Sequence, residues 1–123
     1  MEESGRYNLM TVYGFDLDGT LTRPEIRNLA NDLFAAGHKV YVITGGLSDT
    51  GEWTKEARVK YLKHLGVNYT DIIRCLHPTW EGIAEMKGQA CKRLGVQVML
   101  DDMPVFLNGI RAVCPSAALL LVV

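Results

Sequence analysis

The sequence lacks a long apolar run and lacks an excess of charge of either sign. Of its 123 residues, 22% are charged, and the formal net charge is −1. A strongly basic chain would be drawn to polyanions, so nucleic acid is not implied as a partner. The first ten residues, MEESGRYNLM, lack the basic start and the apolar centre of a signal peptide. We therefore expect a cytoplasmic protein with no membrane partner.

Cysteine is also scarce. Cys75, Cys91 and Cys114 are odd in number and widely spaced, which favours neither a disulfide framework nor a zinc site. Each lies in an apolar stretch, where we expect a buried free thiol. The chain has no internal repeat, low-complexity tract or linker. Its length and its 48% hydrophobic content predict one compact domain over residues 1–123, with a polar leader at 1–9.

Short apolar runs alternate with helical patterns along the chain. We predict strands at 10–17, 40–43, 72–76, 96–100 and 119–123, and helices at 26–34, 53–65, 86–94 and 104–107. Thr22 and Glu25 match a capping box at the start of the first helix. Buried strands separated by amphipathic helices are typical of a parallel sheet covered on both faces. The sequence thus predicts an α/β fold: a three-layer Rossmann-like sandwich with a mostly parallel central sheet of about five strands.

Polar groups follow three of the predicted strands. In such a fold, ligands bind beyond the carboxyl ends of the strands, near the point where the strand order reverses. The groups placed there are Asp16 and Asp18 after the first strand, Thr44, Gly45 and Gly46 after the second, and Asp101 and Asp102 after the fourth. Clustered carboxylates repel one another unless a cation lies among them. Mg²⁺ takes oxygen ligands together with substrate phosphate, and the glycines allow backbone N–H groups to approach a phosphate.

The segment FDLDGTL, at 15–21, resembles the first motif of the haloacid dehalogenase superfamily of hydrolases. The resemblance implies that Asp16 is the nucleophile attacking phosphorus. It implies that Asp18 is the general acid and base, and that its backbone carbonyl helps to hold Mg²⁺. Thr44, in VITGG, would bind the transferred phosphoryl group with Gly45. Asp102 would ligate Mg²⁺ together with Asp16 and Asp18, and Asp101 would support it.

The family also uses a lysine that steadies the negative charge around the nucleophile and the phosphate. We place it at Lys87, which we expect to open the helix before VMLDD, and Lys92 remains an alternative. Lys92 lies further into that predicted helix and is expected to point away from the strand ends. In the family another acid or amide often follows the acidic pair within a few residues, whereas here five residues separate the pair from Asn108.

The resemblance covers 12–102 and implies a phosphatase that cleaves phosphate monoesters through an aspartyl-phosphate, with Mg²⁺ as cofactor. The stretches 20–44 and 45–87 are too short for a cap domain, which predicts an open site. The substrate is not specified: nucleotides, sugar phosphates and phosphorylated nucleic-acid ends are all compatible with this chemistry. Two alternatives remain, namely a phosphotransferase and a catalytically idle phosphate-binding or interaction protein that retains the fold. Neither the oligomeric state nor a lid supplied by a partner subunit can be read from the sequence.

Simpler roles exist for each of these residues. Asp-Gly is a common turn pair, Thr44 can simply end a strand, and Asp101 or Asp102 can cap the helix that Pro104 begins. His77 is interpreted as a loop histidine. Packing in the core or on the surface, rather than lining of the site, is the interpretation favoured for Trp53 and Trp80.

Overall fold

The computed structural model describes residues 10–123, so the predicted leader at 1–9 lies outside the described residues. The elements in chain order are β1 (Val12–Phe15), η1 (Leu17–Leu21), α2 (Pro24–Ala35), β2 (Lys39–Gly46), η2 (Gly51–Trp53), α3 (Lys55–Leu65), β3 (Asp71–Leu76), α4 (Trp80–Leu94), β4 (Val98–Asp101), α5 (Pro104–Val113) and β5 (Ala118–Leu121).

The five strands form one parallel sheet in the order β3-β2-β1-β4-β5. The chain starts at the central strand β1, moves outward to β2 and β3, and then returns to pair β4 with the free side of β1. The strand order therefore reverses between β1 and β4. In open α/β sheets a ligand site forms at this reversal, just beyond the carboxyl ends of the two strands.

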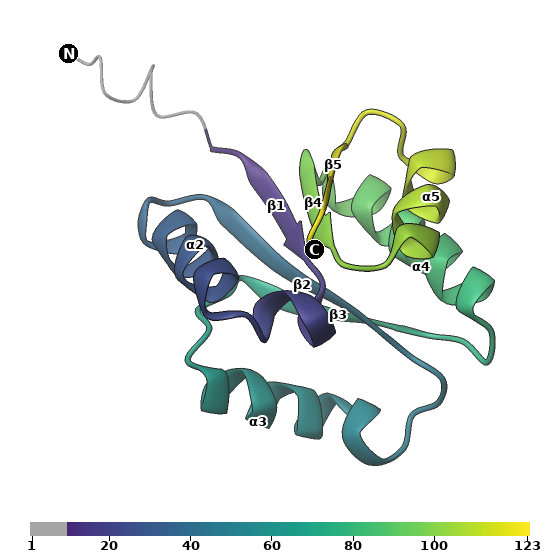
Figure 1. The fold of residues 1–123 in the computed structure, drawn as a ribbon, viewed down its shortest axis with the longest axis horizontal. Helices are drawn as coiled ribbons and strands as arrows, with labels where there is room; N and C mark the ends of the chain where they lie inside the picture. Colours follow the sequence, from purple (N-terminus) through teal and green to yellow (C-terminus); the bar gives the residue numbers. More distant parts are fainter. Residues whose placement is uncertain (1–9) are drawn as a thin grey trace.

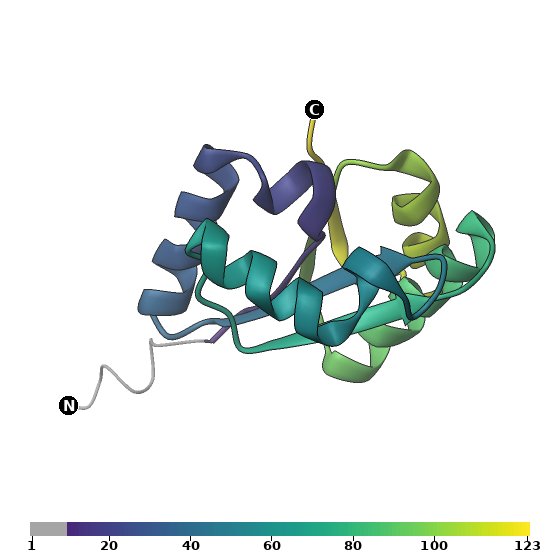
Figure 2. The ribbon, with the colours of Figure 1, turned by 90° about the horizontal axis from the view of Figure 1, so that it is seen from below.

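Helices cover both faces of the sheet and make a three-layer, Rossmann-like sandwich (Figure 1). One buried core joins the sheet to α2 and α3 and includes Phe15, Val42 and Leu62. The other joins the opposite face of the sheet to α4 and α5 and includes Met99, Ile83 and Ile110. Figure 2 shows the C-terminus beside η1, where Arg23 donates a hydrogen bond to the carbonyl of Val123. The predicted fold class is confirmed.

Helices α4 and α5 pack closely because small residues lie between them. A β-carbon at Gly109 would come within 2.5 Å of the β-carbon of Ala84, and one at Gly88 within 2.8 Å of Val113. Close approach of this kind fixes the rotation of α4 about its axis. It thereby determines which of its side chains face the sheet.

Several predicted boundaries were wrong. The third predicted helix begins at Trp80 instead of residue 86, where Thr79 accepts a hydrogen bond from the Gly82 N–H as an N-cap. The fourth extends to Val113 rather than ending at 107. The predicted capping box does not form, because the Thr22 hydroxyl accepts a hydrogen bond from the N–H of Gly19 and helix α2 begins afterwards, at Pro24.

The three cysteines are free and buried, as expected. Burial raises the pKa of Cys75 to about 11 and that of Cys91 to about 12, so both thiols stay protonated and act as packing groups. None of the helices described is long and apolar enough to span a membrane.

Candidate functional site

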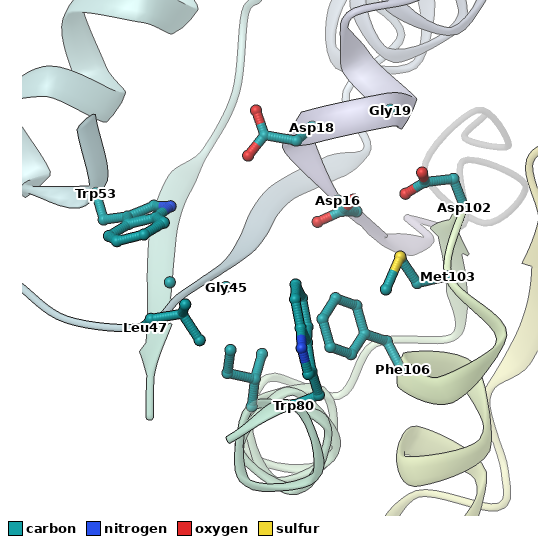
Figure 3. Close-up of a pocket in the computed structure, with 12 residues that line it drawn as sticks. Asp16, Asp18, Gly19, Gly45, Leu47, Trp53, Trp80, Asp102, Met103 and Phe106 are labelled. Atoms are coloured by element: carbon teal, nitrogen blue, oxygen red, sulfur yellow. The ribbon is translucent and has the colours of Figure 1, made fainter. Parts of the chain in front are cut away.

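A pocket of about 270 Å³ opens at the carboxyl ends of β1, β2 and β4. Figure 3 shows Asp16 and Asp18 on one side of it and aromatic side chains on the other. The residues that line it are Asp16, Asp18, Gly19, Gly45, Gly46, Leu47, Trp53, Trp80, Ile83, Asp102, Met103 and Phe106. The pairing of β1 with β4 brings Asp16 and Asp102 to the same end of the sheet. At this end the N–H of Asp16 donates a hydrogen bond to the carbonyl of Leu100 at 2.9 Å.

A buried lysine joins two of the carboxylates. The Nζ of Lys87 lies 2.8 Å from Oδ1 of Asp16 and 2.8 Å from Oδ2 of Asp101. The Lys87 and Asp101 side chains are completely buried, and that of Asp16 is 7% exposed. Hydrogen-bonded, water-excluded ion pairs hold their partners in a fixed geometry. The Asp16 carboxylate is thus positioned before any ligand binds.

The position of Lys87 follows from the face of α4 that packs against the sheet. Ile83 and Cys91, four residues to either side, are buried in the core, so the lysine between them must also enter the interior. Its Nζ lies 4.2 Å from the centroid of the Phe106 ring, which adds a cation–π contact. Lys92 is exposed. The structure therefore brings Lys87, and not Lys92, to the carboxylates. Lys87 lies in the middle of a longer helix and not at its start.

The local electrostatics leave negative charge in excess. Burial, aided by the charge of Asp101 and opposed by Lys87, raises the pKa of Asp16 to about 8. Burial also raises the pKa of Asp101. Burial alone would lower the pKa of Lys87, but the two carboxylates raise it overall, so the ammonium stays charged. The single ammonium of Lys87 thus lies near a cluster of three carboxyl groups, those of Asp16, Asp101 and Asp102. A further positive charge would be favourable there.

The donor set fits a hard divalent cation. One oxygen each from Asp16, Asp101 and Asp102 can be chosen such that all three lie within 4.8 Å of one another. Both oxygens of Asp101 are already occupied, one by Lys87 and the other by the N–H of Met103 at 3.1 Å. By contrast, Oδ1 of Asp102 is buried and has no hydrogen-bond partner in the part of the chain that the structure describes. Asp16 and Asp102 are accordingly the two carboxylates of this cluster that each keep an oxygen free for a metal ion.

Gly19 provides the space that Asp102 occupies. Its φ of 79° lies in the left-handed region, which favours glycine. A β-carbon there would also lie 2.1 Å from Oδ2 of Asp102. No other residue can occupy position 19 without moving the Asp102 carboxylate, so the glycine of the DLDGT segment serves both the turn and the acidic group.

The side chain of Asp18 is turned away from this cluster. It is 61% exposed, and its carboxylate pairs with Nη1 of Arg58, 3.1 Å from Oδ2 and 3.3 Å from Oδ1. Figure 3 shows it projecting toward the side of the pocket on which Trp53 lies. The carboxylates of Asp16, Asp101 and Asp102 form the cluster, and the Asp18 carboxylate is not part of it. Only the backbone carbonyl of Asp18 remains as a ligand of the kind that the resemblance implies.

Arg58 was missed at the sequence level. Its side chain is 6% exposed and lies 5.3 Å from the centroid of the Tyr61 ring. The buried residues of helix α3 are Arg58 and Leu62. No local signal marks an arginine whose partner is 40 residues away in the chain.

The remaining predicted residues lie at the site to different degrees. Thr44 is 2% exposed and is not among the lining residues, while the next residue, Gly45, lines the pocket. Trp53 and Trp80 do line it, so the favoured interpretation of both as packing residues was wrong. The His77 ring stays outside the lining and accepts hydrogen bonds near the start of α4, from the N–H of Thr79 at 3.1 Å.

Comparison with known proteins is informative about the fold. No protein-family model and no curated protein matches the chain. A chain in the structure of the Pnkp1/Rnl/Hen1 RNA repair complex is similar to it, with a TM-score of 0.71 and 16% sequence identity. The match covers 94% of this chain and 43% of that chain, so this chain spans less than half the length of its structural neighbour. At this identity the likeness shows a shared fold alone.

Proposed function

We propose that this chain is a Mg²⁺-dependent phosphatase of the haloacid dehalogenase type, which cleaves phosphate monoesters through an aspartyl-phosphate on Asp16. The observation that carries the proposal is the buried Asp16–Lys87–Asp101 bridge at the floor of an open pocket. Burial of a charged pair such as Lys87 and Asp16 costs desolvation energy, so stability alone does not explain its place beside a pocket. A nucleophile has to be held in place, because its attack on phosphorus requires fixed alignment.

The first step forms the covalent intermediate. A carboxylate oxygen of Asp16 attacks phosphorus, and the bond from phosphorus to the ester oxygen breaks. Asp18 donates a proton to that oxygen, and the alcohol departs. Lys87 offsets part of the negative charge that accumulates when a carboxylate meets a phosphate. Gly45, where β2 ends at the pocket wall, lets backbone approach the phosphoryl oxygens.

The second step restores the enzyme. Asp18 takes a proton from water, the water oxygen attacks phosphorus, and the bond between phosphorus and the Asp16 oxygen breaks to release inorganic phosphate. The Asp18 carboxylate must reach both the leaving oxygen and the incoming water from its place at the pocket mouth. Arg58 is the residue that orients it, through two contacts from one guanidinium nitrogen.

The metal would be held by Asp16 and Asp102. Bound there, Mg²⁺ supplies positive charge that favours the ionised form of Asp16 and offsets the charge of the phosphate. The raised pKa of Asp16 supports this requirement, because a carboxyl with a pKa of about 8 is mostly protonated at neutral pH and cannot attack.

Within residues 10–123, each connection that returns to the sheet carries one main helix and no inserted cap domain. The site is therefore open, which suits a phosphate on a large or exposed group. Because one chain of similar structure comes from an RNA repair complex, phosphorylated RNA ends belong in the substrate panel beside nucleotides and sugar phosphates.

Release of inorganic phosphate from such a panel, with Mg²⁺ or with EDTA, tests the proposal. We expect hydrolysis that requires Mg²⁺ and is lost in Asp16→Asn and Asp102→Asn. Asp32→Asn, an exposed aspartate on α2, is the matched control and should keep full activity. Hydrolysis that survives Asp16→Asn would contradict the mechanism.

Two further measurements define the reaction. Hydrolysis in ¹⁸O-labelled water should place one labelled oxygen in each phosphate released, whereas transfer of the group to an added alcohol would identify a phosphotransferase. Beryllium fluoride, which mimics an aspartyl-phosphate, should bind the wild type with Mg²⁺ and fail to bind Asp16→Asn. Failure of both hydrolysis and beryllium fluoride binding in the wild type would favour an idle protein that keeps the fold.

A further inference from the structure

The wall of the pocket opposite the carboxylates is almost entirely apolar. Six of the lining residues have large hydrophobic side chains: Leu47, Trp53, Trp80, Ile83, Met103 and Phe106. The charged lining residues are all aspartates, and no lysine or arginine of residues 10–123 lines the pocket. The wall therefore presents dispersion contacts but no countercharge for a second phosphate.

Two tryptophans flank the pocket from separate elements. Trp53 ends η2 and Trp80 begins α4, and Figure 3 shows them on opposite sides of the space below Asp18. Trp80 is 52% exposed, and its ring packs against Phe106 with centroids 5.8 Å apart and planes tilted by 37°. One side of the Trp80 ring is thus supported from within the protein. The rest remains available to a ligand, although exposing an indole to water is unfavourable in the free protein.

The chemistry of this wall selects the group attached to the phosphate. Sugar hydroxyls would lose their hydrogen bonds to water against Trp53, Trp80 and Phe106 without gaining protein partners. A diphosphate would bring extra negative charge to a site already rich in carboxylates. A flat, uncharged aromatic ring would instead stack on the indoles, a contact that is favourable for every base because each has a π-face.

From these observations we propose that the substrate is a nucleoside monophosphate whose base lies between Trp53 and Trp80, while its phosphate reaches Asp16. This inference rests on the proposed phosphatase function. A base is favoured over the smaller phenol ring of a phosphotyrosine because a pocket of 270 Å³ leaves space for a sugar as well. Since the wall carries few hydrogen-bonding groups, the pocket accepts the four bases with similar efficiency.

Kinetics on matched substrates test the preference. We expect kcat/KM for adenosine 3′- and 5′-monophosphate to exceed that for ribose 5-phosphate, and Trp80→Ala to reduce this ratio by roughly 5- to 150-fold, the range expected for loss of one stacked base. Trp80→Phe should retain most of the ratio. Phe34→Ala removes an aromatic ring of similar exposure on α2, lining a separate pocket, and should leave the ratio unchanged. Comparing kcat/KM for oligonucleotides phosphorylated at the 3′ or 5′ end with kcat/KM for mononucleotides shows whether the enzyme prefers the end of a strand or a free nucleotide.

Binding can be followed without turnover. The sequence contains two tryptophans, and both line the pocket, so the intrinsic indole fluorescence reports on this site. In Asp16→Asn, adenosine monophosphate with Mg²⁺ should quench that fluorescence at saturation, and ribose 5-phosphate should not. Adenosine without phosphate should quench at higher concentration.

The outcomes separate the two proposals. Hydrolysis of monoesters without a preference for nucleotides, and without quenching, would overturn the nucleotide pocket and keep the phosphatase. Quenching by nucleotides with no hydrolysis of any ester would overturn the phosphatase and keep the nucleotide pocket. A higher kcat/KM for phosphotyrosine than for any nucleotide would also overturn the assignment.

Discussion

Replacing Lys87 by methionine is the perturbation that bears most directly on the site. Methionine keeps much of the length and apolar volume of the lysine but removes the ammonium that lies 2.8 Å from an oxygen of Asp16 and 2.8 Å from an oxygen of Asp101. Both carboxylates then remain buried without their main countercharge. Lys92→Met makes the same chemical change on the same helix at an exposed position, and so serves as the matched control.

The expected cost follows from burial. Removing one partner of a buried ion pair costs about 3–5 kcal/mol, because it leaves an uncompensated charge. Typical unfolding free energies are about 5–15 kcal/mol, so Lys87→Met should lose about a fifth of the stability or more. For a chain of this length we expect the melting temperature to fall by about 10–20 °C. Lys92→Met should change the unfolding free energy by less than about 0.5 kcal/mol.

The loss should also depend on pH. Burial already raises the pKa of Asp16 to about 8 and raises that of Asp101, and removal of Lys87 takes away the charge that opposes both shifts. An acid whose pKa is higher in the folded than in the unfolded state loses its stabilising contribution as pH rises. The gap between wild type and Lys87→Met should therefore be wider at pH 8 than at pH 5.

Urea unfolding followed by circular dichroism in EDTA, at both pH values, measures this gap. Equal stability of Lys87→Met and Lys92→Met at pH 8 would refute the reasoning. So would a gap that narrows as pH rises.

Three other changes test separate parts of the site. In EDTA the stability of the wild type should decline between pH 5 and pH 7, because the raised pKa of the Asp16 carboxyl makes its stabilising contribution fade as pH rises, and Asp16→Asn should remove this decline. Parallel stability profiles for the two proteins would contradict this. Gly19→Ala and Gly37→Ala each place a β-carbon at a positive φ, which should lower the unfolding free energy by about 1–2 kcal/mol. Only the β-carbon at position 19 would contact Asp102, so only Gly19→Ala should abolish Mg²⁺ binding measured by calorimetry. Arg58→Met should lower kcat by about tenfold or more with a smaller change in KM, because the Asp18 carboxylate, the proposed general acid and base, loses the contact that orients it. A change confined to KM would instead identify Arg58 as a substrate-binding residue.

Much of the architecture could be predicted because strands and helices carry local signals. Apolar runs marked β1 to β5. Helices α3 and α4 end at Leu65 and Leu94, as predicted, each followed by a glycine in the left-handed conformation, Gly66 and Gly95. The parallel direction of the strands and the helices on both faces of the sheet were predicted from the alternation of strands and helices along the chain. Boundaries were less predictable: α4 begins six residues earlier than expected, at a Thr79 cap whose pattern was not recognised.

Sequence alone placed Asp16, Asp18, Asp101 and Asp102 at the ends of their strands, because a strand that breaks into carboxylates and glycines is a local feature. The tertiary structure decided which groups meet. Rotation of α4, fixed by its close packing on α5, buries Lys87 and leaves Lys92 in solvent. Packing of α3 on the sheet brings Arg58 to Asp18 across 40 residues, and loops from two sides bring Trp53 and Trp80 to one pocket. Contacts of this kind depend on how whole elements pack against one another, and periodicity within a single segment does not encode them.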